Sequence, residues 1–228
     1  MKTLGLIGGT SWTSTIEYYR YINEAVAQKL GGLHCAKVVL ANLDFYFLEE
    51  AMRANQWDVA ASILTKEAAR LYAAGVDGIL MCSNLVHKVF DEVQASVPVP
   101  LLHIGDALAE EITARQYRTV ALLGTRPIME ESFYSERIHA RSGARVLVPA
   151  REDRGYINSA IFGRMCLNVY TDDDRARFNH IIDGLKGQGA EGVILGCTEL
   201  PVLLAEASVP LLNSTLVHSL RTVEWALA

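Results

Sequence analysis

The chain contains an internal repeat, which restricts the possible folds more than any other feature of the sequence. Three matches recur in the same order at an offset of roughly 115 residues, and a constant offset is the mark of repeated structural units. The matches are LGLIGGT (4–10) with VALLGT (120–125), GVDGILMCSNL (75–85) with GAEGVILGCTE (189–199), and VPLL at 99–102 and again at 209–212. The alternative is a generic recurrence of glycine, apolar run and turn, but the shared order favours two halves with the same fold.

Within each half, short apolar runs alternate with longer helical patterns such as Trp57–Ala74 and Arg175–Gln188. This alternation predicts parallel sheets with helices on both faces. The expected strands are Thr3–Ile7, Ala36–Leu43, Gly78–Met81, Leu101–Ile104, Thr119–Leu123, Arg145–Val148, Gly192–Leu195 and Leu211–Leu212.

The expected fold class is α/β, with two similar three-layer α/β/α halves related by pseudo-two-fold symmetry. We assign residues 1–98 plus 211–228 to the first domain and residues 99–210 to the second. Ligands of open α/β sheets bind beyond the carboxyl ends of the strands. We therefore expect an active site in a cleft between the halves.

Composition excludes several classes of protein. The net charge is −5 with no run of Lys or Arg, which argues against nucleic acid or an anionic membrane as a partner. The four cysteines form no CxxC pair and no metal-ligand spacing, so we expect neither a metal nor another cofactor. Sparse cysteine usage fits a reducing compartment, and neither a signal segment nor an apolar run of about 20 residues is present. We expect a cytoplasmic protein.

The second repeat match selects two residues for chemistry. Without gaps, Gly75 aligns with Gly189 and Ser83 aligns with Cys197. Each of the two latter residues follows a predicted strand and precedes a helix, where backbone N–H groups and the helix dipole favour an anion. We therefore expect Cys197 to have a lowered pKa and to act as a base or nucleophile, although a small buried filler residue is the simpler role of such a cysteine.

Polar turns after other strands are candidates for holding an anionic ligand. GGTSW (8–12) supplies Thr10 and Ser11, and GTR (124–126) supplies Thr125. Neither turn has the dinucleotide-binding or Walker pattern. The positions expected to contact substrate are Thr10, Ser11, Arg53, Asn84, Leu85, Thr125, Thr198 and Glu199. His87, four residues after Ser83, is a candidate for orienting Ser83, and an exposed helix position is an equal alternative.

These residues resemble the aspartate/glutamate racemase family, cofactor-independent enzymes related to hydantoin racemases. The resemblance covers nearly the whole chain. It rests on LGLIGGTSWTSTIEYY (4–19), LGGLH (30–34), MCSNLVHKV (81–89), LLGTR (122–126), FY (133–134) and GCTEL (196–200). It implies a two-domain α/β homodimer that removes a proton from Cα of a small amino acid, with aspartate and glutamate as the expected substrates. The family's two acid/base residues fall on Ser83 and Cys197, the pair that the repeat alignment also selects.

The chain departs from the family pattern at several of these positions. Ser83 stands where most members have Cys, Leu85 where the CNT motif has Thr, and Asn213-Ser214 where Asp-Thr is usual. Thr10 also replaces a methionine. Two other functions therefore stay open beside the racemase. One is a one-thiol decarboxylase or isomerase of small dicarboxylates that uses Cys197, and the other is a non-catalytic binder of small carboxylates.

Overall fold

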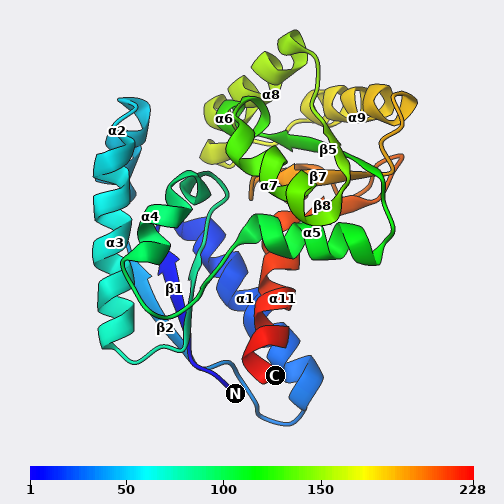
Figure 1. Ribbon diagram of the computed structural model, residues 1–228. Helices are drawn as coiled ribbons and strands as arrows, with labels where there is room; N and C mark the ends of the chain where they lie inside the picture. The colour runs from blue at the N-terminus through cyan, green and yellow to red at the C-terminus, as the bar shows by residue number, and fades with distance from the viewer. The chain divides into compact units, whose positions relative to one another are not determined.

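The computed structural model describes residues 1–228 and contains two four-stranded parallel sheets with helices around them (Figure 1). The strands are β1 (Leu4–Gly8), β2 (Val38–Asn42), β3 (Gly78–Met81), β4 (Leu101–Leu102), β5 (Thr119–Gly124), β6 (Arg145–Leu147), β7 (Gly192–Gly196) and β8 (Leu211–Asn213). The first sheet has the order β2-β1-β3-β4 and the second has the order β6-β5-β7-β8. Because all pairs are parallel and the two orders are equivalent, the predicted fold of two similar α/β halves is confirmed.

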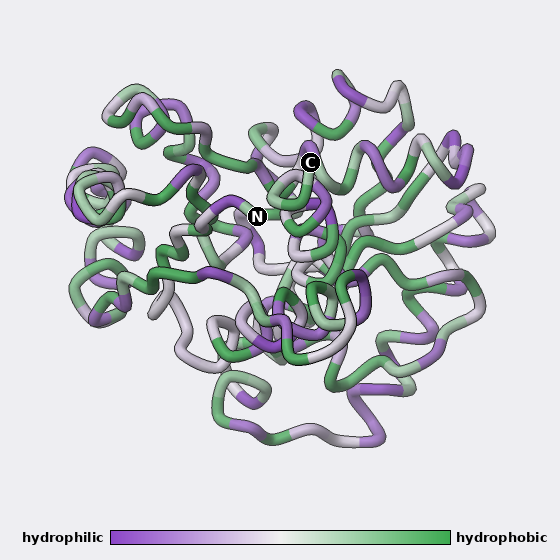
Figure 2. The backbone as a smooth tube through the Cα atoms, turned by 90° about the horizontal axis from the view of Figure 1, so that it is seen from below, coloured by the Kyte–Doolittle hydropathy of each residue, from purple (hydrophilic) through white to green (hydrophobic).

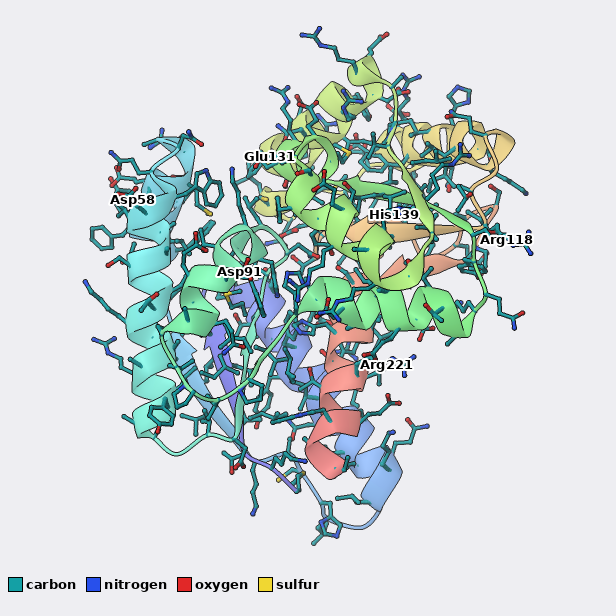
Figure 3. The ribbon with its side chains drawn as sticks, viewed as in Figure 1. Asp58, Asp91, Arg118, Glu131, His139 and Arg221 are labelled. Carbon is teal, nitrogen blue, oxygen red and sulfur yellow. The ribbon has the colours of Figure 1, made fainter.

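The helices follow the strands as the alternating pattern predicts. They are α1 (Trp12–Leu30), α2 (Phe45–Arg53), α3 (Trp57–Ala73), the 3-10 helix η1 (Leu85–Val89), α4 (Phe90–Ala95), α5 (Ile104–Ala114), α6 (Arg126–Glu130), α7 (Ser132–Ser142), α8 (Arg151–Gly163), the 3-10 helix η2 (Met165–Leu167), α9 (Asp172–Gly187), α10 (Leu200–Leu203) and α11 (Ser214–Leu227). Asp58, labelled in Figure 3, lies in the first turn of α3, where a carboxylate complements the helix dipole. None of the helices combines the length and the apolar character needed to cross a bilayer.

The chain divides into two compact units whose boundaries differ from those expected. The first unit comprises Met1–Ile104 and His218–Ala228, and the second comprises Gly105–Val217. The sequence assignment placed the expected strands Leu101–Ile104 and Leu211–Leu212 in the wrong half, because β4 pairs with β3 in the first sheet and β8 pairs with β7 in the second. The boundaries therefore fall after β4 and inside α11 rather than after residues 98 and 210.

The sheet of the first unit separates two apolar cores. On one face, Leu4 and Leu6 of β1 pack with Tyr18 of α1 and Val223 of α11. On the other face, Ile7 packs in a cluster with residues of α2, α3 and α4. Figure 1 shows α1 and α11 on one side of this sheet and α2, α3 and α4 on the other. In the hydropathy colouring of Figure 2 the helices alternate between green and purple, as expected for helices with one buried face.

The second unit buries one face of its sheet beneath α8 and α9. Leu123 of β5 and Leu195 of β7 pack against Ile157 of α8 and Phe178 of α9 in a single cluster. All four side chains are at most 1% exposed. The central strands β5 and β7 are therefore held rigidly, and so are the points at which they end.

The start of the second central strand is built alike in both units, which supports the repeat alignment. Gly75 and Gly189 both adopt positive φ, of 79° and 99°, just before β3 and β7. The carboxylate of Asp77 then accepts from the backbone N–H of Thr3, and that of Glu191 accepts from Thr119 at 3.0 Å. Because glycine, acid and strand recur at matched places, the two units share local structure as well as strand order.

Candidate active site

In the first unit, the polar turn after β1 and the segment after β3 lie side by side. Ile7 and Met81 are register partners at the ends of these neighbouring parallel strands. Neighbouring strands are about 4.8 Å apart, so the residues that follow them share one edge of the sheet. Thr10 follows β1 and Ser83 follows β3. This edge of the sheet therefore brings together Thr10 and Ser83, two of the positions selected from the sequence.

Gly9 makes the turn after β1 possible. Its φ is +86°, and a Cβ at this position would lie 2.2 Å from the backbone oxygen of Leu43. Its N–H donates to Thr15 Oγ1 at 2.9 Å. A side chain at residue 9 is excluded both by the positive φ and by the close approach to Leu43. The glycine therefore allows the turn that places Thr10 directly after β1.

Thr10 and Ser11 differ in how their hydroxyl groups are used. Thr10 is 6% exposed, and its Oγ1 is buried without a hydrogen-bond partner. Ser11 Oγ instead lies 2.6 Å from Thr13 Oγ1. Buried hydroxyl groups are usually satisfied, so the free oxygen of Thr10 is the stronger candidate for binding a ligand.

After β3, Ser83 is half-buried, and its Oγ makes no hydrogen bond to another protein group. Asn84 is 4% exposed and precedes η1, which begins at Leu85. Cys82 is fully buried against Tyr18 and Ile22, and burial raises the pKa of its thiol. Of the two adjacent residues, Ser83 is therefore the one with a side chain available for chemistry.

The second unit repeats this arrangement with closer spacing. Gly124 of β5 and Gly196 of β7 are register partners, and Thr125 and Cys197 follow them directly. Thr125 is 8% exposed, and its Oγ1 is buried without a partner, as in Thr10. Two neighbouring strand ends thus present a free hydroxyl group beside a thiol.

The Cys197 thiol is hydrogen-bonded to the carboxylate of Glu199, which lies two residues further on in the same turn. Cys197 Sγ donates to Glu199 Oε2 at 2.9 Å, and Thr198 Oγ1 lies 2.9 Å from the same oxygen. Burial raises the pKa of Cys197 well above its usual value, and the charge and hydrogen bond of Glu199 raise it further. The resting group is therefore a thiol.

This finding corrects the expected lowering of the Cys197 pKa. The helix that follows, α10, has only four residues, and Ser83 is followed by the 3-10 helix η1. Such short elements have too few aligned peptides to provide the helix dipole on which the expectation depended. Desolvation and the neighbouring Glu199 carboxylate both disfavour the thiolate.

Arg53 and Leu85 lie differently from the other predicted contacts. Arg53 is the last residue of α2, its side chain is 70% exposed, and it pairs with Glu49 at 3.4 Å. No hydrogen bond or ion pair joins it to the turns after β1 or β3. Leu85 is half-buried in the first turn of η1 and has no polar atom in its side chain.

Three residues near the candidate groups were missed or left open by sequence reasoning. Burial and, after it, the charge of Glu199 raise the pKa of both Cys166 and Tyr170, so these two residues lie near that carboxylate. Nothing in their spacing from Cys197 indicates this, because α9 and β7 separate them along the chain. His87 is 3% exposed, with Nδ1 2.8 Å from the backbone oxygen of Ser83. The i, i+4 spacing was the signal for this contact.

No group of three or more His, Cys, Asp or Glu side chains is arranged to hold a metal ion. All four cysteines are free thiols. The polar atoms at the strand ends are thus a serine and a thiol at matched positions, two unpartnered threonine hydroxyls and one carboxylate.

The chain is similar to members of a racemase family over nearly its whole length. The family model for Asp/Glu/hydantoin racemases matches residues 7–221. A broad specificity amino-acid racemase, RacX, from Bacillus subtilis (strain 168) is 26% identical over 163 residues, covering 71% of this chain and 70% of that protein. A candidate Asp/Glu racemase from Yersinia pestis is 41% identical with a TM-score of 0.95, and an aspartate racemase homologue from Pyrococcus horikoshii OT3 is 33% identical with a TM-score of 0.88. Each of these two structures aligns over 100% of both chains.

Fold, strand-end residues and similarity agree on the class of protein. The chain belongs to the Asp/Glu/hydantoin racemase family. It is therefore an enzyme of the isomerase class, a racemase, as the resemblance of its motifs implies.

Proposed function

We propose that the protein is a cofactor-independent amino-acid racemase that acts on aspartate or glutamate, with Cys197 and Ser83 serving opposite faces of Cα. The observation that carries the proposal is the equivalence of these two residues. Each lies just after the second central strand of its unit, β3 or β7. That strand is preceded by a glycine with positive φ and pairs in parallel with the first central strand, β1 or β5. Racemisation needs two proton-transfer groups, and duplicated units supply one each.

The threonine hydroxyls support an anionic substrate. Thr10 Oγ1 and Thr125 Oγ1 are both buried and unpartnered, each beside the strand end that carries Ser83 or Cys197. A carboxylate oxygen would satisfy such a donor, and a charge-assisted bond is about twice as strong as a neutral one. Without an electron sink such as pyridoxal phosphate, donors to the substrate carboxylate also stabilise the carbanion formed at Cα.

The names of the relatives support the choice of substrate. An aspartate racemase homologue and a candidate Asp/Glu racemase are similar over the complete chain, and the curated relative is named for broad specificity toward amino acids. We keep Asn84, Leu85 and Thr198 as substrate contacts, with Ser11 and Arg53 as more distant candidates. The departure at Leu85 removes a hydroxyl, and the free oxygen of Thr10 supplies one in the same unit.

A second function is favoured by one observation. Ser83 Oγ has no protein base beside it, because both ring nitrogens of His87 contact backbone groups, Ser83 O at 2.8 Å and Ile104 N at 3.3 Å. A hydroxyl without a base is a poor proton acceptor. A one-thiol decarboxylase or isomerase of small dicarboxylates, which uses Cys197 alone, is therefore the alternative.

Proton exchange at Cα tests these functions directly. Each enantiomer of aspartate, glutamate and a panel of neutral amino acids is incubated with the protein in heavy water and followed by NMR and chiral chromatography. A racemase exchanges the Cα proton and forms the enantiomer. Loss of carbon dioxide or a rearranged product identifies the one-thiol enzyme, and the absence of any exchange would reject catalysis on amino acids.

The proposal extends to assembly and location. From the family resemblance we propose a homodimer without metal or organic cofactor, located in the cytoplasm. The four free thiols support a reducing compartment. Light scattering of the purified protein distinguishes a dimer from a monomer of 25.1 kDa.

A further inference from the structure

The proposed reaction needs a base that removes the proton from one of its two acid/base groups before that group attacks Cα. Cys197 is a thiol at rest, and Ser83 carries a hydroxyl group. Both candidate groups therefore hold their protons before the substrate binds. Proton abstraction from Cα requires one of them to give its proton away first, and a base must lie within hydrogen-bond reach of it.

Glu199 is the group that meets this requirement. Its Oε2 lies 2.9 Å from Cys197 Sγ, on the same turn after β7. Thr198 Oγ1, also 2.9 Å away, holds the same oxygen in place. Glu199 is half-buried and forms no ion pair that would compete for this oxygen. The carboxylate is thus fixed by two donors, one of which is the proposed acid/base thiol.

We propose that Glu199 is a proton relay for Cys197 rather than a contact for the substrate carboxylate. This inference rests on the proposed function. The Cys197 S–H bond breaks as an O–H bond forms on Glu199 Oε2, which leaves a thiolate. The thiolate then takes the Cα proton, so that one S–H bond is restored, one C–H bond is broken, and the electron pair stays on the substrate. When a proton returns to Cα from Cys197, Glu199 replaces it.

The relay explains why a carboxylate stands beside a group that must become an anion. Glu199 lowers the resting population of thiolate, which a merely activating residue would not do. In exchange, it accepts the proton internally, in a half-buried place where transfer to solvent is hindered. The same carboxylate repels an acidic side chain of the substrate, which argues against its earlier assignment as a substrate contact.

The relay makes two measurable properties of Cys197 change in opposite directions. In Glu199→Gln the negative charge and the oxygen that can take up a proton are lost, so the pKa of Cys197 falls. Alkylation of Cys197 by iodoacetamide at fixed pH, followed by peptide mass spectrometry, should then become faster by about three- to fourfold for each unit by which the pKa falls, because the gain in thiolate exceeds the loss of its nucleophilicity. Cα–H exchange through Cys197 should become slower by about 10²-fold, since the internal base is gone. If Glu199 had only a structural role, its replacement would not make alkylation faster and Cα–H exchange slower at the same time.

Two further variants control the experiment. Glu206→Gln removes the same charge from an exposed position shortly after α10 and should change neither rate. Glu199→Asp keeps the charge on a shorter side chain. In this variant alkylation of Cys197 should stay slow, and the rate of Cα–H exchange should fall in part. It tests the relay if Glu199→Gln does not fold. Unchanged exchange in folded Glu199→Gln, or alkylation as slow as in the wild type, would overturn the relay. If the wild type itself exchanges no amino acid, the proposed function fails, whereas the alkylation arm still reports on the Cys197–Glu199 link.

Discussion

His87 donates its Nδ1 hydrogen to the backbone carbonyl oxygen of Ser83 across 2.8 Å. The tautomer follows from the other ring nitrogen, because His87 Nε2 lies 3.3 Å from the N–H of Ile104 and can only accept from it. The neutral ring therefore links the end of β3 to the start of α5. His87 cannot take a proton from the Ser83 hydroxyl, and its role is to hold the backbone from which that hydroxyl projects.

This link predicts different behaviour for two amide variants of His87. In His87→Asn the amide can replace Nδ1, and in His87→Gln it can replace Nε2. We expect racemisation, which needs Ser83, to fall by roughly tenfold more in the glutamine variant than in the asparagine variant, as misplacement of a reacting group is costly. Cα–H exchange through Cys197 should remain in both. Equal losses in both activities would show that His87 supports only the fold.

The same ring predicts how stability depends on pH. Burial, followed by the charges of His103 and His218, lowers the pKa of His87 well below 6.5. Below pH 6.5 the unfolded chain takes up a proton that the folded chain refuses, so stability falls as pH falls from 6.5 toward the folded pKa. The slope from one such group is at most about 1.4 kcal/mol per pH unit. Urea unfolding at pH 7.5 and 5.5 should show a smaller difference in His87→Asn than in the wild type.

The repeat made most of the fold predictable, whereas pairing between distant segments did not follow from it. All eight expected strands are present, because β-branched and leucine-rich runs between turn signals are strong local patterns. The strands at Leu101–Leu102 and Leu211–Leu212 were assigned to the wrong units, since a strand as short as Leu101–Leu102 carries no information on its partner. Which sheet it joins depends on contacts far away in the sequence.

The site was predictable in its positions but not in its protonation. The alignment selected Ser83 over Cys82, and the structure buries Cys82 in an apolar cluster. The expected low pKa of Cys197 was wrong, because the decisive causes are burial and the contact with Glu199. Both depend on how the turn after β7 folds, and the motif alone gives only the order of the residues.

Replacing Cys197 by alanine should abolish turnover and leave the fold intact. Loss of a general acid or base costs typically about 10²–10⁴-fold in rate, and the residue is half-buried at a strand end rather than in the core. Cys166→Ala is the matched control, since its thiol lies near the same Glu199 and burial raises its pKa to about 11. The measurement is the rate of racemisation, with circular dichroism to confirm that each variant is folded. More than about a tenth of wild-type activity in Cys197→Ala would contradict the role of Cys197 as an acid/base residue.

Valine in place of Thr10 or Thr125 should weaken substrate binding and preserve stability. Each hydroxyl is buried without a partner, and leaving such a group unsatisfied costs about 1–3 kcal/mol. The isosteric valine removes that cost, so thermal stability should hold or rise. KM for an acidic amino acid should increase about tenfold, as expected for one lost hydrogen bond to a charged group.

Thr222→Val controls for packing. Thr222 Oγ1 is also buried and unpartnered, but it lies in α11, away from the strand ends. This variant should gain stability without any change in KM. If all three valine variants behave alike, the free hydroxyls of Thr10 and Thr125 are features of packing and not of the site.

Ser83 and Cys197 differ in how readily each can remove a proton from Cα. A serine hydroxyl is much harder to ionise than a thiol, and no base contacts Ser83 Oγ. Ser83 can nevertheless give a proton to a carbanion, which is the easier direction. Catalysis should therefore be lopsided: the enantiomer whose Cα–H faces Cys197 should exchange rapidly in heavy water and its mirror image slowly.

Two variants of Ser83 test this asymmetry. Ser83→Cys should accelerate the slow direction and bring the two rates closer, because a thiol is the better base. Ser83→Ala should suppress racemisation while exchange with retention continues through Cys197. Racemisation of both enantiomers at the wild-type rate in Ser83→Ala would remove Ser83 from the mechanism. Cys82 could not replace it, because that thiol is fully buried against α1 and burial raises its pKa. The second proton would then have to come from water. In that case the rate of racemisation would not depend on whether residue 83 is serine, cysteine or alanine.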